Sequence, residues 1–268
     1  MLTLLFLGDV VGEPGRSAVI ARLPELKRDW SLDFVIVNGE NAAAGRGITP
    51  KITIDLLRAG VSVITTGDHI WDRKEIVPFI ETEPRLLRPL NYPSGAPGGG
   101  TIVLETAKGK VGVINVQART FMQPILENPF PLLDAAVNEL RRETPIIIVD
   151  AHGETTSEKI AIGRFLDGRV SAVLGTHTHV QTADEQVFEH GTAFICDAGM
   201  CGPIHSILGR AIEPVVTRFL SSLPAAFPIA KGETRLRGVV VEIDETSGRA
   251  LRIARVDEPA PPGAHVPA

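Results

Sequence analysis

Residues that could bind metal ions recur at five places along the chain, each directly after a short apolar run. They are carboxylates, one amide and imidazoles: Asp9, Glu40, Asn41, Asp68, His69, Asp150, His152, His177 and His179. Oxygen and nitrogen ligands of this kind, with no thiolate among them, suit Fe, Mn or Zn better than Cu(I). Four of the seven histidines of the chain lie in these segments. Chance placement explains such a set poorly, so the sequence predicts a metal centre.

The segment His177-Thr178-His179 is the most informative of the five. In an extended segment, side chains two residues apart leave the same face, so one imidazole could meet one metal ion while its neighbour meets a second. Glu40 carries two carboxylate oxygens and could bridge the pair. A lone Asp after a strand is more often a turn residue, and a lone His is more often structural. The prediction therefore depends on the whole set.

The apolar runs that precede these residues are typical of β-strands in a layered α/β protein, where they alternate with amphipathic helices. The expected strands cover residues 2–7, 34–37, 61–64, 102–104, 111–116, 146–149, 170–174, 193–196, 239–243 and 251–256. The expected helices cover residues 16–28, 50–57, 132–142 and 157–165, with Thr49 as the N-cap of the second. Open α/β sheets form their sites at the carboxyl ends of the strands, so we expect the metal ligands to meet there.

The length of 268 residues allows a sizeable core and fits one domain. We expect that domain to cover residues 1–257 and to be followed by a flexible tail, residues 258–268, rich in Pro, Gly and Ala. Nowhere do about 18 apolar residues run together, so no membrane span is expected. The apolar N-terminus lacks a basic n-region and is predicted to be a first strand, not a signal peptide.

Charge and cysteine content narrow the expected partners. The formal net charge is −5, and there is no long basic run, which argues against long nucleic acid as a partner but not against a single nucleotide. Cys196 and Cys201 are the only cysteines and form neither a CxxC motif nor a disulfide framework. They favour a reducing, cytoplasmic location. A homo-oligomer is expected, although no sequence feature marks its interface.

Taken in order, these segments resemble the motifs of calcineurin-like metallophosphoesterases, and more closely those of their YmdB-like branch. The resemblance lies in the strings LGDVVGEPGR, VNGENAAAGRGIT, TTGDHIWD, DAHGE and GTHTHVQTAD, and extends to about Arg255. It implies a four-layer αββα sandwich with a dinuclear metal site at the carboxyl ends of the strands. It also implies a phosphodiesterase, with 2′,3′-cyclic nucleotides among its substrates and two divalent or mixed-valence metal ions. Iron is the expected metal, with manganese or zinc as alternatives.

The same resemblance assigns roles to individual residues. One metal ion would be held by Asp9, Glu40, Asn41 and His179, and the other by Glu40, Asp68, His152 and His177. His69 would protonate the leaving group. Two such ions, roughly 3.5–4 Å apart, can clamp a phosphoryl group and hold a bridging hydroxide for in-line attack. The third motif departs from the family pattern, because Asp68 stands where Asn is usual. We expect its extra charge to tighten metal binding and to weaken the Lewis acidity felt by the substrate.

Other classes of protein could use similar residues. A binuclear amidohydrolase or metallopeptidase is one alternative, but the chain has no HExxH motif and the order of its ligands fits phosphoesterases better. A metal-containing nucleotide sensor with little or no turnover is another, although a sensor need not keep a complete hydrolytic site. A purely structural α/β protein does not account for two histidines two residues apart beside the other acid and imidazole segments.

Overall fold

Side chains along the central strands alternate between two separate cores. In the computed structural model, which describes residues 1–261, strand β1 (Leu2–Val10) directs Leu4 and Phe6 to one side and Leu5 and Leu7 to the other. Successive residues of a strand point to opposite faces, so an unbroken apolar run belongs to a strand that is covered on both faces. The sequence of β1 therefore already requires a layer on each side of its sheet.

Two six-stranded sheets supply the inner layers. In the first sheet, β1 pairs in parallel with β2 and β10 and antiparallel with β11, in the order β12-β11-β10-β1-β2-β3. Its other strands are β2 (Phe34–Asn38), β3 (Val63–Thr65), β10 (Met200–Pro203), β11 (Thr234–Ile243) and β12 (Ala250–Pro259). Four parallel strands of this sheet end at the same edge, and that edge carries Asp9 and Asn38.

In the second sheet, four parallel strands are flanked by one antiparallel strand at each side, in the order β4-β5-β6-β7-β9-β8. Its strands are β4 (Thr101–Thr106), β5 (Gly109–Gln117), β6 (Ile147–His152), β7 (Ala172–Thr176), β8 (Gln186–Val187) and β9 (Ala193–Ile195). The first two form the predicted hairpin. The carboxyl ends of β6 and β7 carry His152 and Thr176.

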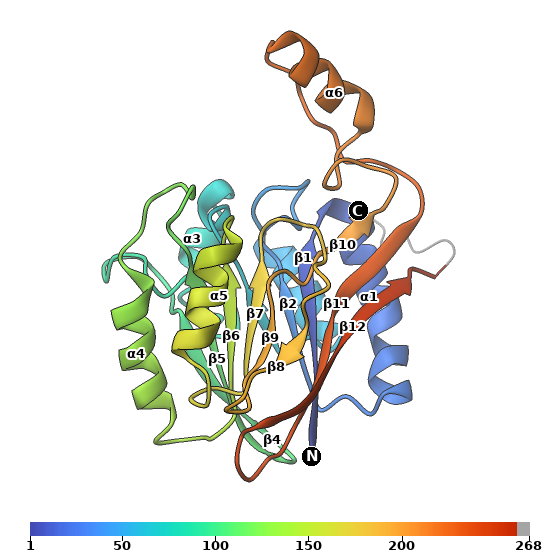
Figure 1. The fold of residues 1–268 in the computed structure, drawn as a ribbon. Coiled ribbons are helices and arrows are strands. Elements are labelled where there is room, and N and C mark those ends of the chain that lie inside the picture. The colour runs from blue at the N-terminus through green and yellow to red at the C-terminus, as the bar shows by residue number, and fades with distance from the viewer. Residues whose placement is uncertain (262–268) are drawn as a thin grey trace.

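Helices cover the outer face of each sheet, so the molecule has four layers (Figure 1). One core lies between the sheets, another joins α1 and α2 to the first sheet, and a third joins α4 and α5 to the second. The helices are α1 (Gly12–Asp29), α2 (Pro50–Arg58), α3 (Ile76–Phe79), α4 (Pro129–Leu140), α5 (Thr156–Phe165) and α6 (Ile212–Ser221), and one 3₁₀ turn covers Ile70–Asp72. The predicted αββα sandwich is confirmed.

The alternation of side chains along a strand also determines which way the polar residues at the strand ends point. Asn38 follows Ile36 by two residues and Asp150 follows Ile148 by two, and both isoleucines belong to the core between the sheets. Asn38 and Asp150 consequently face each other across that core, where the Asn38 Nδ2 donates to Asp150 Oδ2 at 3.0 Å. This contact ties the two sheets together directly beneath the predicted site.

Most predicted elements are present, and Thr49 caps α2 through a hydrogen bond from the Ile52 amide, as expected. Helices α3 and α6, the 3₁₀ turn at Ile70–Asp72 and the short strands β8 and β10 were not predicted. Strand β12 continues to Pro259, two residues into the predicted tail, and residues 262–268 lie outside the described part of the chain. Within residues 1–261, no helix combines the length and the apolar character needed to cross a bilayer.

Candidate metal centre

Four of the predicted ligands meet in one cluster. One ligand atom from each of Glu40, Asp68, His152 and His177 lies within 4.8 Å of all the others. The Nε2 atom of His152 is 3.2 Å from both Glu40 Oε1 and Asp68 Oδ1, and 3.1 Å from Nδ1 of His177. Two carboxylates and two ring nitrogens therefore converge on one point, which is a donor set that a cation satisfies.

The remaining predicted ligands lie beside this cluster. The Oδ1 atom of Asn41 is 3.0 Å from Nε2 of His179, whose other ring nitrogen is 3.2 Å from the Leu208 carbonyl oxygen. Both of these oxygens can only accept, so with the ring proton on Nδ1 the Nε2 atom and the Asn41 oxygen would present two lone pairs to a shared cation. Asp9 is fully buried, and its Oδ1 has no hydrogen-bond partner. Burying a carboxylate oxygen without a hydrogen-bond donor costs desolvation free energy. A cation bound to that oxygen would offset this cost.

Hydrogen bonds behind His152 fix its tautomer. The Thr176 hydroxyl donates to Asp150 Oδ1 at 2.7 Å, so its oxygen accepts from Nδ1 of His152 at 2.8 Å. Nε2 is then the ring atom that faces Glu40 and Asp68. Burial raises the pKa of Asp150 to about 6 against the opposing effects of His152 and its hydrogen-bond donors. Such supporting groups orient metal-binding imidazoles in many proteins.

His177 is oriented in a similar way from the opposite side. Its Nε2 lies 3.2 Å from Oε2 of Glu154, while its Nδ1 faces His152. Glu154 is about half exposed, so this carboxylate reaches the centre from the protein surface. The two histidines of the cluster thus present different ring nitrogens, Nε2 from His152 and Nδ1 from His177.

The segment that carries His177 and His179 is not extended, and the prediction that both side chains leave one face of a strand is wrong. β7 ends at Thr176, and both histidines have positive φ, 103° for His177 and 64° for His179. Positive φ is rare for residues other than glycine, and such strain persists only when the surroundings enforce it. The turn directs His177 toward His152 and His179 toward Asn41, so the two imidazoles reach different sets of ligands by a sharp bend.

The electrostatics of the cluster show how strongly it attracts positive charge. Burial alone would lower the pKa of His152, but Glu40 and Asp68 raise it well above its ordinary value. For Asp68, burial is outweighed by hydrogen bonds from His152 and His177, and its pKa lies below the ordinary value. Burial raises the pKa of Asp9. The carboxylates that favour a proton on His152 would equally favour a metal cation in its place.

Gly67 makes room for these ligands. A Cβ atom at this position would lie 2.2 Å from both Glu40 Oε2 and His152 Nε2. Only glycine lets the backbone pass so close to two ligand atoms. The Gly-Asp-His motif therefore has a steric reason for its first residue.

The centre opens into a cleft of about 520 Å³, and His69 is part of its wall. His69 Nδ1 is 3.4 Å from Asp72 Oδ2 and 3.6 Å from Asp68 Oδ2. Its side chain is a quarter exposed, and Nδ1 is the ring nitrogen that faces the two carboxylates. His69 is thus beside the four-residue cluster but outside it, as the prediction of a separate role requires. Arg46 and Arg210 also line the cleft.

Several supporting residues were not predicted. Asn38, Thr65 and Thr176 all hydrogen-bond to Asp150, and Glu154 contacts His177. The alternation of side chains along each strand could have placed Asn38 and Thr176 near Asp150, because all three side chains face the core between the sheets. No sequence feature marks Lys159, whose Nζ donates to Asp197 Oδ2 at 3.0 Å in the buried interior.

The protein is of the metallophosphoesterase type. Its two sheets face each other, and their common edge carries a set of carboxylates, an amide and imidazoles. Residues 5–256 match the model of the family described as YmdB-like protein, and the chain belongs to this family. The predicted resemblance is confirmed.

Relatives from several bacteria share most of the chain. A Bacillus subtilis (strain 168) protein named 2′,3′-cyclic-nucleotide 2′-phosphodiesterase is 48% identical over 255 residues, which cover 95% of this chain and 96% of that protein. A solved Mycoplasma pneumoniae structure, described as a novel phosphatase, is 35% identical with a TM-score of 0.89, covering 97% of this chain and 95% of its own. A hypothetical protein from Thermus thermophilus is 40% identical with a TM-score of 0.91, covering 97% of this chain and 100% of its own.

Proposed function

We propose that the chain is a metal-dependent phosphodiesterase that hydrolyses phosphodiesters such as 2′,3′-cyclic nucleotides. The observation that carries the proposal is the convergence of lone pairs at the strand ends, where Glu40, Asp68, His152 and His177 present their ligand atoms to one point. The name of the Bacillus subtilis relative supports the substrate class, since that protein is named for action on 2′,3′-cyclic nucleotides.

Two metal ions per chain fit the residues present. Asp9, Glu40, Asn41 and His179 would hold one, and Glu40, Asp68, His152 and His177 the other. The unpartnered Oδ1 of Asp9 supports the first set, and the short distances within the cluster support the second. When bound, divalent ions would offset the charge of the phosphate and lower the pKa of water. We propose iron, with manganese or zinc as substitutes that the same ligands accept.

His69 is the proposed general acid. Its Nδ1 faces Asp72 and Asp68, so the ring is held by carboxylates on one side while Nε2 remains for the substrate. A protonated imidazole so placed can deliver its proton to the departing alkoxide. Asp72 would keep the ring oriented, and the Arg46 guanidinium, 2.8 Å from Asp72 Oδ2, positions that carboxylate in turn.

The walls of the cleft would select an anionic substrate. Arg46 and Arg210 place two guanidinium groups in the lining of the cleft. Arg210 is held by the carbonyl oxygens of Ala44, Gly45 and Phe227, so its charge has a fixed position. We also propose a cytoplasmic location, which the two free, buried cysteines support.

The test combines metal content with turnover. Elemental analysis should find about two metal ions per chain, and the protein should hydrolyse bis-p-nitrophenyl phosphate and 2′,3′-cyclic AMP. His177→Ala should reduce both quantities, whereas His190→Ala, on an exposed histidine paired with Asp167, should reduce neither. Metal without hydrolysis would favour a sensor that binds nucleotides, and no metal after loading with Fe or Mn would refute the proposal.

A further inference from the structure

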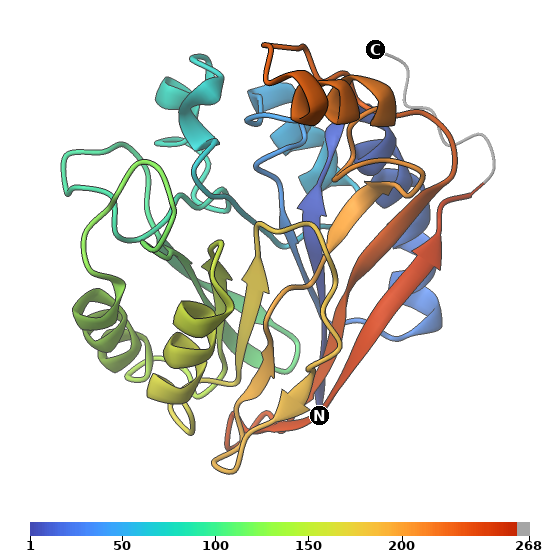
Figure 2. The ribbon, with the colours of Figure 1, turned by 45° about the horizontal axis from the view of Figure 1, so that its top comes forward.

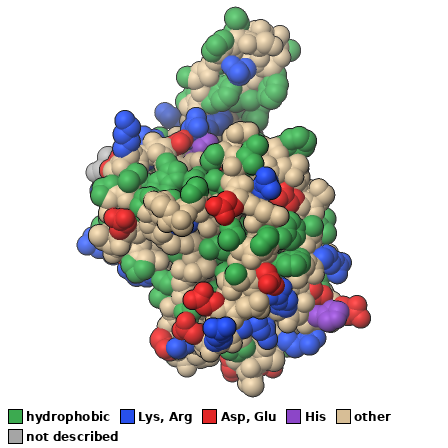
Figure 3. Space-filling view, turned by 90° about the vertical axis from the view of Figure 1, so that its left-hand side faces the viewer, with side chains coloured by type: hydrophobic (Ala, Val, Ile, Leu, Met, Phe, Trp, Pro, Cys, Tyr) green, Lys and Arg blue, Asp and Glu red, His purple; other side chains and the backbone are tan. Residues whose placement is uncertain are grey.

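The segment that leads into α6 brings an arginine to the cleft of the metal centre. Helix α6 projects from the body above the carboxyl ends of β1 and β10 (Figure 1, Figure 2), and Arg210 lies two residues before it. In the space-filling view, Lys and Arg side chains gather where this projection meets the body, next to a histidine (Figure 3). Arg210 lines the cleft together with Arg46. The cleft therefore has positively charged walls in addition to its metal ligands.

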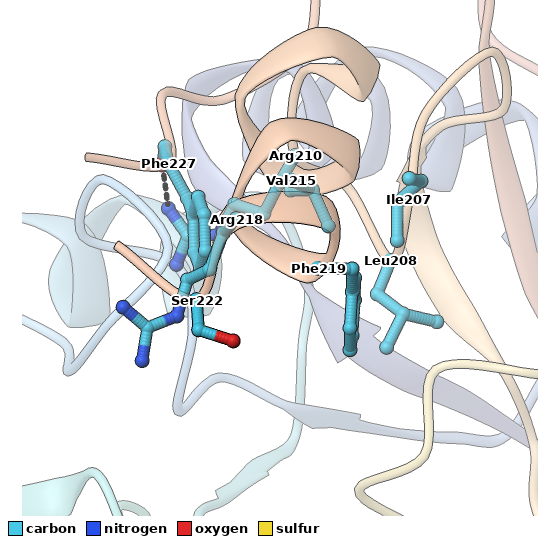
Figure 4. Close-up of a pocket in the computed structure, with 8 residues that line it drawn as sticks. All are labelled: Ile207, Leu208, Arg210, Val215, Arg218, Phe219, Ser222 and Phe227. Carbon is cyan, nitrogen blue, oxygen red and sulfur yellow. Dashed lines mark hydrogen bonds between the residues drawn. The ribbon is translucent and has the colours of Figure 1, made fainter. Parts of the chain in front are cut away.

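Arg210 is held by carbonyl oxygens and by no carboxylate. Its guanidinium donates to the carbonyl oxygens of Gly45 at 2.6 Å, Phe227 at 3.0 Å and Ala44 at 3.3 Å, and Figure 4 shows the bond to Phe227. Among residues 1–261, no carboxylate oxygen lies within 4.0 Å of its nitrogen atoms. A half-buried cation held in this way has a defined position but no counter-charge, so it favours an anion beside it.

Two more guanidinium groups lie around the same loop, residues 42–47. Arg73 donates to carbonyl oxygens of the loop at 2.7 and 3.1 Å, and Arg46 pairs with Asp72 at 2.8 Å. In the described part of the chain, Asp72 is the only residue with a carboxylate within 4.0 Å of any of the three groups. Burial and the charge of Arg46 lower the pKa of Arg210. An anion in contact with both arginines would relieve the repulsion between them.

Short contacts tie Arg210 to two of the proposed metal ligands. The Gly45 carbonyl that accepts from Arg210 also accepts from Asn41 Nδ2 at 3.3 Å. The carbonyl oxygen of Leu208, two residues before Arg210, is 3.2 Å from His179 Nδ1. Asn41 and His179 are proposed to hold the same metal ion. The guanidinium therefore has a set position relative to the phosphate that would be hydrolysed.

The reacting phosphate does not need the charge of Arg210. Asp9, Glu40 and Asp68, together with a hydroxide, would balance the charge of two divalent ions. A protonated His69 would balance the single negative charge of a phosphodiester. The charge of Arg210 is then left over, and a substrate with only one phosphate group cannot neutralise it.

We propose that Arg210, with Arg46 beside it, binds a second phosphate group of the substrate, one ribose away from the phosphate that is hydrolysed. This inference rests on the proposed function and narrows its substrate class to 2′,3′-cyclic nucleotides that also carry a phosphate on the 5′ oxygen. That phosphate can be the 5′-phosphate of a single nucleotide, or the phosphodiester that joins the terminal nucleotide to a short RNA. A guanidinium can bind either group through paired N–H···O bonds.

Hydrolysis of three substrates by the metal-loaded full chain tests the proposal. They are 2′,3′-cyclic AMP, the same nucleotide with a 5′-phosphate, and the adenosine dinucleotide that ends in a 2′,3′-cyclic phosphate. At least one of the two substrates with a second phosphate should have a kcat/KM about 10–100-fold above that of 2′,3′-cyclic AMP, the effect of charge-assisted hydrogen bonds. Whichever of the two is preferred identifies the source of the second phosphate.

Substitutions of Arg210 assign this preference to the residue. Arg210→Met should remove most of it, whereas Arg210→Lys keeps the charge without the planar fork and should retain part of it. Arg252→Met is the matched control, because Arg252 is 67% exposed on β12 and should keep the full preference. Circular dichroism and metal content should match the wild type in all three variants, which separates loss of the site from loss of the fold.

A calorimetric measurement gives a readout that needs no turnover. Adenosine 3′,5′-bisphosphate should bind the wild type about 10–100-fold more tightly than adenosine 3′-phosphate, and Arg210→Met should lose that difference. Turnover of all three substrates at similar kcat/KM would overturn the second-phosphate site and leave the proposed function standing. A preference that survives Arg210→Met would overturn the role of Arg210. No turnover of any substrate would contradict the proposed function, and the calorimetric comparison would still decide whether Arg210 binds a second phosphate.

Discussion

The Nζ atom of Lys159 lies 3.0 Å from Oδ2 of Asp197, and both side chains are buried. Each member of this ion pair also binds the turn that carries the metal-ligand histidines. Lys159 donates to the Thr176 carbonyl at 3.3 Å, and Asp197 accepts from the Thr178 amide at 3.0 Å. The pair therefore holds the backbone on both sides of His177, where φ is 103°. Together with the hydrogen bond from the His177 amide to Asp9 Oδ2 at 3.0 Å, it holds the strained turn in place.

Lys159→Met should remove about 3–5 kcal/mol of unfolding free energy, because it leaves the buried Asp197 carboxylate without its counter-charge. It should also lower metal content, since the turn loses its support. Urea denaturation and elemental analysis measure the two effects. Lys51→Met is the matched control, because Lys51 pairs with Asp55 on the surface and should cost less than about 1 kcal/mol. Adding Asp197→Asn to Lys159→Met should recover part of the loss, whereas purely additive losses would show that the pair is not coupled.

Gly67→Ala should abolish metal binding with little effect on the rest of the fold. The added methyl group would lie 2.2 Å from ligand atoms of Glu40 and His152, so at least one ligand must move. Gly95→Ala is the control, since a Cβ at Gly95 has nothing within 4 Å. Elemental analysis after loading should find normal metal content in the control and a severe loss in Gly67→Ala. Normal content in both would mean that Glu40 and His152 do not bind metal together.

Apolar periodicity was enough to predict most of the layers, because strands covered on both faces have unbroken apolar runs such as Phe34–Val37. The metal centre was also predictable, since parallel strands bring their carboxyl ends to one edge. Helix α6 escaped prediction because its apolar face packs on no core, so its pattern indicates no layer. The bend at His177 and His179 depends on Lys159 and Asp197, which are distant in sequence. Contacts of that kind follow from tertiary packing and leave no local signal.

Asp68→Asn should weaken metal retention and change turnover several-fold. The Asp68 carboxylate is 3.2 Å from His152 Nε2 and 3.5 Å from His177 Nδ1, so its charge acts directly on the centre. An amide oxygen can still bind metal but supplies no net charge, so a bound cation should polarise the phosphate more strongly. We expect higher turnover of the loaded protein and faster metal loss to a chelator, with Asp55→Asn unchanged in both. Identical retention and turnover in Asp68→Asn would count against the role of its charge.

Alkaline pH should destabilise the fold through Cys201. Burial raises the pKa of this thiol from 9.0 to about 12. Above pH 9 the unfolded chain loses the thiol proton while the folded chain keeps it, so unfolding free energy falls as pH rises toward 12. The expected slope from this group is about 1.4 kcal/mol per pH unit. Urea denaturation between these pH values should show a shallower decline for Cys201→Ala, and an unchanged slope would refute the assignment.

His69→Gln should separate proton donation from metal binding. Glutamine keeps much of the size of the side chain but cannot deliver a proton, so metal content should equal that of the wild type. Hydrolysis of 2′,3′-cyclic AMP, which expels an alkoxide, should fall by about 10²–10⁴-fold, the usual contribution of a general acid. An activated aryl ester such as bis-p-nitrophenyl phosphate needs little protonation and should lose much less. The pH–rate profile for 2′,3′-cyclic AMP adds a second readout. The fall in rate at alkaline pH, which reports loss of the proton from the general acid, should vanish in the variant. Equal losses on the two substrates would instead make His69 a positioning residue that acts through Asp68 or Asp72.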